Sequence, residues 1–305
     1  QVCVNVQAVD LFGRLDGNLT KQEVVETAGK FHAILEEFTR HLDDRSLSEN
    51  MVLKNAGLLA NFIGAFDLAT HHLEKDYRVA AKMKESNPLF FCLTIRLLAG
   101  VEMLKGDYRN VERHLSEAIL LLKNQPEPAP EEKVERLRLH RMLGAMLLNT
   151  GQLDKAIPEL DEAYYLSLDM DFDNPYEYGL LCSDLAEAHI GLEVFDKALE
   201  MLRIASEQFD LIHQLPEICL ERGTLFLNKA LAYAGLDDFK KAPLSVGKAL
   251  EIYEQLLPED HILLSKAYQV KSSIELAFYV HEVNVEKENA DDELQQENLK
   301  NAERD

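Results

Sequence analysis

The sequence predicts an all-α fold, a solenoid of about five to six helix-turn-helix repeats with a capping helix at each end. Three regular spacings lead to this prediction. A small residue, called here the reference position of its repeat, recurs every 42 to 45 residues: Ala69, Val111, Ala156, Ala198 and Ala242. A leucine or valine follows it by four residues: Leu73, Leu115, Leu160, Leu202 and Val246. A second small residue precedes it by twelve: Gly57, Ala99, Gly144, Ala186 and Ala230. Self-similarity at such a period is typical of stacked repeats.

The side chains around each reference position explain why the repeat forms a helix pair. Small and large residues at helical spacing let two antiparallel helices approach closely, because the large side chain fills the groove between them. Gly64, Gly106 and Gly151 stand five residues before their reference positions, where a turn favours a residue that tolerates positive φ. The spacings predict helix pairs over residues 49–82, 88–123, 132–169, 176–213 and 217–256.

The chain is predicted to have three parts. Residues 1–48 form an N-terminal capping region that contains an amphipathic helix. Residues 49–285 form the solenoid, which ends in a helix over residues 260–283 that covers the last repeat. Residues 286–305 form a polar, acidic tail, either a frayed helix or disordered, because nothing apolar in it requires folding. The proline-rich stretch 124–131 indicates a longer loop inside the solenoid, since the repeat spacing continues through it.

One unit of the chain carries a pattern that is known from other proteins. Leu143-Gly144, Gly151, Leu153, Ala156 and Ala163 resemble the tetratricopeptide signature, in which a Leu-Gly pair, a glycine and two alanines come at these offsets. The period is longer than the usual 34 residues of that superfamily. In this respect the chain resembles the long-repeat members, such as kinesin-light-chain-like adaptors. The resemblance implies a right-handed α-solenoid whose first helices line a concave face that holds another chain.

Composition limits the classes of partner. The formal net charge is −22, from 54 acidic and 32 basic residues. This charge disfavours nucleic acids and anionic membranes, because both require a basic surface. No uncharged apolar run is long enough to predict a membrane-spanning helix. The four cysteines are far apart and form no Cys-x-x-Cys pair. This predicts reduced thiols and an intracellular protein, in the cytoplasm or the nucleus.

Catalytic and metal-binding patterns are weak in this sequence. Asp169, Asp171 and Asp173 resemble the opening of a calcium loop, but the glycine and the distal glutamate of that loop are missing. His71 and His72 are adjacent, so on a helix they point about 100° apart and cannot chelate one ion. No glycine-rich phosphate loop or nucleophile elbow is present. We therefore expect no enzyme activity, no cofactor and no metal site.

The tetratricopeptide resemblance implies which side chains line the concave groove. The cations of this predicted peptide-binding groove are Lys54, Arg96, Arg138 and Arg141. Its apolar residues are Leu180, Ile190, Leu227 and Leu231. Its amides are Asn61, Asn149 and Asn228. The groove would be basic toward the N-terminus and apolar toward the C-terminus. The cations either bind a carboxylate-bearing peptide, as arginine does with two hydrogen bonds, or pair with carboxylates of neighbouring repeats.

These observations predict a noncatalytic adaptor or scaffold. Its groove would bind a peptide or helical segment of a partner protein that has acidic and hydrophobic residues. Apolar anchors would supply the affinity, and the basic end would set the register. The alternative is a constitutive structural subunit of a larger complex, for example a ubiquitin-ligase or motor assembly, which packs through its outer face. Self-association stays open.

Overall fold

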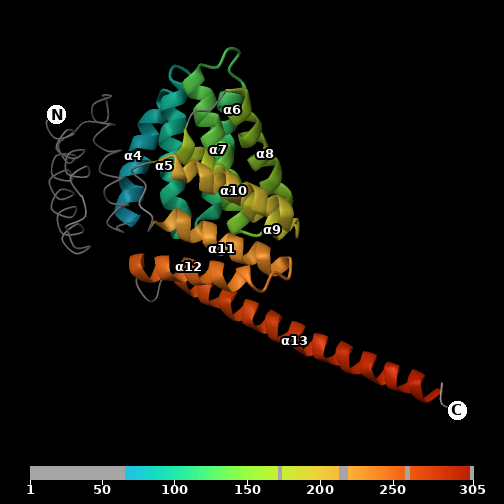
Figure 1. Cartoon of the computed structure of the whole chain (residues 1–305). Helices are drawn as coiled ribbons and strands as arrows, with labels where there is room; N and C mark the ends of the chain where they lie inside the picture. The colour runs from blue at the N-terminus through green and yellow to red at the C-terminus, as the bar shows by residue number, and fades with distance from the viewer. Residues whose placement is uncertain (1–65, 171–173, 213–218, 258–261, 303–305) are drawn as a thin grey trace. The chain divides into compact units, whose positions relative to one another are not determined.

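The computed structural model describes residues 66–170, 174–212, 219–257 and 262–302, and in this part of the chain every regular element is an α-helix (Figure 1). The predicted N-terminal cap lies outside the described residues, as do most of the first helix pair, Lys54 and Asn61. The helices are α4 (Phe66–Lys82), α5 (Pro88–Lys105), α6 (Tyr108–Lys123), α7 (Pro130–Asn149), α8 (Leu153–Asp169), α9 (Pro175–Gly191), α10 (Phe195–Asp210), α11 (Leu220–Gly235), α12 (Lys241–Leu256) and α13 (Ile262–Ala302). Their bounds agree closely with the predicted helix pairs.

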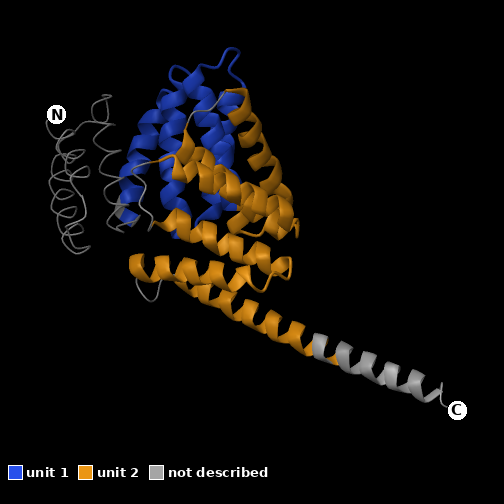
Figure 2. Cartoon of the chain, in the orientation of Figure 1, with its two compact units in different colours: residues 1–146 blue, residues 147–305 orange. Residues whose placement is uncertain are grey.

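The chain divides into two compact units, residues 1–146 and residues 147–305 (Figure 2). In unit 1, α5 packs against both α4 and α6. In unit 2, α9 packs against α10 and α11 against α12, and α13 packs on α12 and α11. The division falls inside α7 and not in the proline-rich stretch 124–131.

The core of each helix pair consists of the residues that define the repeat. All five reference positions have side chains with no exposed surface: Ala69, Val111, Ala156, Ala198 and Ala242. The residues four positions later are 0–2% exposed: Leu73, Leu115, Leu160, Leu202 and Val246. Small residues at helical spacing face a neighbouring helix, so the two backbones approach and exclude water from the large side chains between them.

Two glycines show how closely the paired helices of unit 2 approach. A Cβ atom on Gly179 of α9 would lie 2.5 Å from the ring of Phe209 at the end of α10. A Cβ atom on Gly223 of α11 would likewise lie 2.5 Å from the ring of Tyr253 on α12. Each glycine therefore provides the space for an aromatic ring thirty residues later in the chain. The repeat is thus conserved inside this chain at the level of side-chain packing.

Local signals set where the helices begin and end. The Asn87 side chain accepts a hydrogen bond from the Phe90 backbone N–H and caps α5, which begins at Pro88. Gly106 ends the same helix in the left-handed region, with φ of 76°. Gly151 has φ of 72° in the turn between α7 and α8. Both glycines were predicted to occupy turns, and side chains other than glycine rarely adopt this conformation.

The last helix, α13, differs in length from the others. Its first three turns bury Leu264, Ala267, Val270 and Ile274 against α11 and α12. The backbone then stays helical to Ala302, past residue 283 where the sequence predicted the helix to end. Beyond the packed turns, the side chains of Leu276 and Tyr279 are each 64% exposed. Apolar surface therefore remains open on α13.

Candidate functional site

Two of the predicted groove cations in unit 1 contact one buried carboxylate. Arg96 on α5 donates from Nε to Oε1 of Glu135 on α7, at 2.6 Å. Nη1 of Arg138, one turn along α7, lies 3.6 Å from Oε2 of the same glutamate. The Glu135 side chain is 1% exposed, whereas each arginine side chain is 29% exposed. Of the two interpretations of the basic residues, pairing with a carboxylate of a neighbouring repeat therefore describes Arg96, whereas Arg138 contacts a carboxylate of its own helix.

Burial and the two arginines act on the charge of Glu135 in opposite directions. Burial raises the pKa of Glu135 above its ordinary value, and the guanidinium groups of Arg96 and Arg138 oppose that rise. The two arginine side chains remain partly open to solvent. Arg141, one turn further along α7, is half-buried. The arginine side chains of this cluster are therefore accessible to solvent, while Glu135 is enclosed.

The predicted apolar groove residues of unit 2 fall into two groups. Leu180 and Ile190 on α9 are partly buried against the core of α9 and α10, and Leu231 on α11 is partly buried against α12 and α13. Leu227 and Asn228 are each only 2% exposed. Their predicted surface position is wrong, because α13 packs onto α11 and encloses Leu227 in the core cluster. Asn149, the last residue of α7, is exposed.

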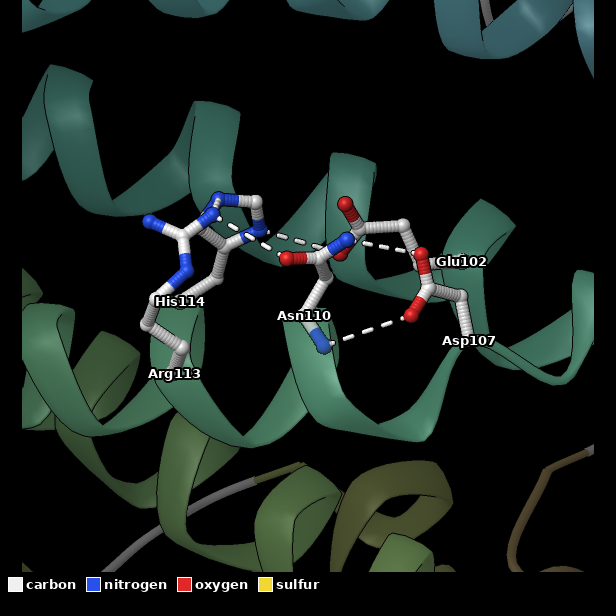
Figure 3. Close-up of polar contacts among 5 residues, drawn as sticks. All are labelled: Glu102, Asp107, Asn110, Arg113 and His114. Carbon is white, nitrogen blue, oxygen red and sulfur yellow. Dashed lines mark hydrogen bonds and ion pairs between the residues drawn. The ribbon is translucent and has the colours of Figure 1, made fainter.

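A polar pocket of about 280 Å³ lies between α4, α5 and α6 in unit 1. At its inner wall, Nδ1 of His114 lies 2.9 Å from Oε2 of Glu102, and both side chains are buried (Figure 3). Nη2 of Arg113 lies 2.7 Å from the other ring nitrogen of His114. The same Nη2 donates to Oδ1 of Asn110 at 3.3 Å. Asn110 in turn donates to Asp107, which caps α6.

These contacts determine which nitrogen of His114 carries the proton. A guanidinium group can only donate, so Nε2 of His114 accepts from Arg113, and Nδ1 carries the hydrogen that Glu102 accepts. The neutral ring thereby connects a buried carboxylate to a cation. Glu102 and His114 each stand three residues after a small residue of the repeat pattern. The sequence analysis missed this pair, although a search for complementary charges at equivalent repeat positions would have found it.

Cysteines and histidines in the described residues show no reactive arrangement. Cys92 and Cys182 are buried free thiols, and burial raises the pKa of each to about 12. Cys219 is a half-buried free thiol whose pKa is also raised by burial. No group of three or more His, Cys, Asp or Glu side chains there could hold a metal ion. Within the same residues, no helix has the length and apolar character needed to cross a bilayer.

Three solved structures with a similar fold each cover more than half of this chain. BtubC (BKLC) from P. vanneervenii matches with a TM-score of 0.54 and 18% identity, over 70% of this chain and 84% of that one. The nearly identical TPR-like repeats of a putative kinesin light chain from Podosopora anserina match with a TM-score of 0.51 and 16% identity, over 68% and 96%. Aspartyl phosphate phosphatase F from Bacillus subtilis matches with a TM-score of 0.58 and 13% identity, over 83% and 67%.

No protein-family model and no curated protein sequence match the chain. The structural matches carry the assignment of the fold, and their low sequence identity limits them to it. The chain has the all-α solenoid fold of tetratricopeptide-type repeats, as its residue spacings predicted.

Proposed function

We propose that this chain is a noncatalytic scaffold that binds a peptide or helical segment of a partner protein on the surface formed by the first helices of its repeats. The observation that carries this proposal is the continuity of that surface in unit 2. Nζ of Lys266 on α13 lies 3.4 Å from Oε1 of Glu187 on α9, so the ion pair reaches across the intervening first helix, α11. This contact supports a shared face on adjacent first helices as the surface that the ligand occupies.

The side chains on these first helices support a partner with both acidic and hydrophobic residues. In unit 2, the partly buried Leu180, Ile190 and Leu231 offer apolar contacts. In unit 1, the partly exposed guanidinium groups of Arg96 and Arg138 support a ligand that carries a carboxylate. The overall charge of −22 argues against nucleic acids and anionic membranes as ligands. The name of one structural neighbour denotes a phosphatase, but a shared fold does not transfer a reaction.

The second candidate is a constitutive subunit of a larger complex. The exposed Leu276 and Tyr279 on α13 favour it, because apolar side chains that project from a packed helix are typical of a permanent interface. The two candidates differ in how the partner is held. Substitutions on the first helices should weaken the binding of a scaffold's ligand. A constitutive subunit should instead lose its partner when α13 is altered.

Co-purification of the full chain from a lysate, followed by mass spectrometry, identifies the partner. Titration of that partner then compares Leu231→Asp and Arg141→Glu with matched changes outside the first helices, Leu120→Asp and Arg109→Glu, both on α6. We expect the first pair to weaken binding at least tenfold while the second pair does not, with circular dichroism as the fold check. Full binding by both folded groove variants, together with loss of binding in Leu276→Asp, would identify the constitutive subunit instead.

A further inference from the structure

One lysine in unit 2 occupies a position that is leucine in the three preceding repeats. Directly before the small residue of the first helix, those repeats carry Leu98, Leu143 and Leu185, which are 1%, 5% and 4% exposed. The repeat formed by α11 and α12 carries Lys229 there, before Ala230, and its side chain is half-buried. A cation in a core position breaks the pattern of this chain. Such exceptions to an otherwise consistent sequence are expected where function overrides stability.

A second lysine meets the first across an aromatic ring. Nζ of Lys229 lies 5.7 Å from the centroid of the Phe226 ring, and Nζ of Lys248 on α12 lies 5.2 Å from it. At the position of Lys248, six residues after the reference position, the three preceding repeats carry Glu117, Glu162 and Ile204. The residue at this second position varies between repeats, and the first repeat also carries a lysine there, Lys75. Lys229 is therefore the departure from the repeat pattern, and Lys248 lies beside it in the same repeat.

The surrounding charges leave this lysine site electropositive. Among the described residues, neither Lys229 nor Lys248 has a carboxylate within ion-pair distance, although the chain has 54 acidic residues. Asp210 at the end of α10 acts on Lys229 from further away, and Nη2 of Arg222 already donates to it at 2.8 Å. Burial lowers the pKa of Lys229, and the positive charges of Lys248 and Arg222 lower it further. Of the charges that act on Lys229, two are positive and one is negative.

We propose that Lys229 and Lys248 bind a glutamate or aspartate side chain of an acidic peptide segment in a partner protein, which lies across Phe226 between α11 and α12. The two ammonium groups contribute hydrogen-bond donors, and the ring provides an apolar surface for the methylene groups of the ligand. A short acidic segment fits better than a nucleic acid or a bilayer, because a chain with charge −22 repels an extended polyanion.

This site is separate from the proposed groove on the first helices. Lys229 and Leu231 are two residues apart on α11, so their side chains point roughly 200° apart around the helix. Leu231 belongs to the face of the proposed groove, and Lys229 faces Lys248 on α12 and Asp210 on α10. A partner can therefore occupy one surface without the other. Loss of binding at one site also leaves the proposal for the other intact.

The test uses the full chain and a fluorescein-labelled hexaglutamate peptide, with Kd measured by fluorescence anisotropy. Lys229→Leu restores the leucine of the three preceding repeats, and Lys248→Ile copies Ile204. Lys197→Leu on α10 removes an exposed lysine of the same unit and serves as the matched control. We expect each of the first two variants to weaken binding at least tenfold, the control to bind like the unchanged chain, and the wild-type Kd to rise with salt.

A second readout is the lysine side chain itself. In NMR titrations of the full chain, saturation with hexaglutamate should raise the pKa of Lys229, since a bound carboxylate favours the charged form. Hexaglutamate binding that is unchanged in Lys229→Leu and Lys248→Ile overturns the proposal. Binding of inorganic phosphate without binding of the peptide also overturns it. Lys248 is exposed, so Lys248→Ile and the NMR titration decide the matter even if Lys229→Leu does not fold.

Discussion

One cluster of cations in each unit shows a different use of positive charge. In unit 1, Arg96 and Arg138 converge on the buried carboxylate of Glu135, so most of their charge serves the protein's own interior. In unit 2, Lys229 and Lys248 converge on the ring of Phe226, with no carboxylate in ion-pair distance among the described residues. The comparison separates two uses of positive charge in an acidic repeat protein. A cation with an internal partner stabilises the fold, and a cation without one remains available to a ligand.

Removal of Arg96 should have the largest effect on stability. Arg96→Met leaves the buried Glu135 with only the more distant Arg138, and breaking a buried pair in this way costs about 3 kcal/mol in free energy of unfolding. Urea denaturation followed by circular dichroism measures this cost. Arg109→Met, an exposed arginine on α6, is the control and should be nearly neutral. A loss below about 1 kcal/mol in Arg96→Met would show that Glu135 does not need this partner.

The same variant should respond to pH in a defined direction. Glu135 is an acid whose pKa is raised in the folded state, so its ionisation opposes folding and stability falls as pH rises above its unfolded-state value. Arg96 limits that loss by favouring the carboxylate. The difference in stability between the wild type and Arg96→Met should therefore be larger at pH 8 than at pH 4. An equal difference at both values would mean that Arg96 acts through packing alone.

Overpacking should affect the two units alike, because both use the same repeat core. Ala118 on α6 and Ala205 on α10 stand seven residues after their reference positions, and both are 0% exposed. Ala118→Leu and Ala205→Leu should each cost about 1–3 kcal/mol, since a helix pair at this distance has no space for three more carbon atoms. Ser116→Leu and Lys197→Leu test exposed positions on the same two helices. A neutral Ala205→Leu beside a costly Ala118→Leu would show that the repeat core differs between the units.

The sequence predicted the core well because one spacing determines which side chains are enclosed. Ala118 and Ala205 could be assigned to the interior without knowledge of any contact between them and another helix. The same spacing placed Leu227 and Asn228 on the groove surface, and this assignment was wrong, because both are buried. Leu227 is enclosed together with residues of α13, a contact that the repeat spacing of the earlier helices does not specify.

The charged sites were less predictable than the core. Arg96 and Arg138 were visible as cations on first helices, but their shared partner Glu135 depends on how α5 and α7 are offset along their axes. A periodic pattern contains no information on that offset. Lys229 was visible in principle, because it replaces a leucine that three other repeats share. This signal is found only by searching the aligned repeats for a position where one repeat differs from the others.

Replacement of Lys229 should change stability less than Arg96→Met does, and it should increase stability instead of lowering it. Lys229→Leu removes a partly buried charge that burial and two neighbouring cations disfavour, and it supplies the leucine of the three preceding repeats. We expect a gain of about 0.5–2 kcal/mol, the range typical of substitutions that restore a consensus core residue. Thermal unfolding in the absence of any peptide measures it, with Lys197→Leu as the neutral control. A clear loss of stability would mean that the aliphatic stem of Lys229 and its contact with Phe226 outweigh the charge.

The smallest expected effect comes from an exposed ion pair, which tests whether burial or geometry makes the Arg96 pair important. Nη1 of Arg203 lies 2.5 Å from Oε1 of Glu207, one turn later on α10, and the two side chains are 61% and 58% exposed. The distance is as short as that between Arg96 and Glu135, but water surrounds both partners. Arg203→Gln should therefore cost only about 0.3–0.5 kcal/mol in free energy of unfolding.

Urea denaturation in 0.05 M and about 1 M salt distinguishes the exposed Arg203 pair from the buried Arg96 pair, because salt screens exposed charges more strongly than enclosed ones. The effect of Arg203→Gln should disappear at high salt, whereas that of Arg96→Met should persist. If high salt removes both effects, the Arg96 pair is open to water, and burial does not distinguish it from the Arg203 pair.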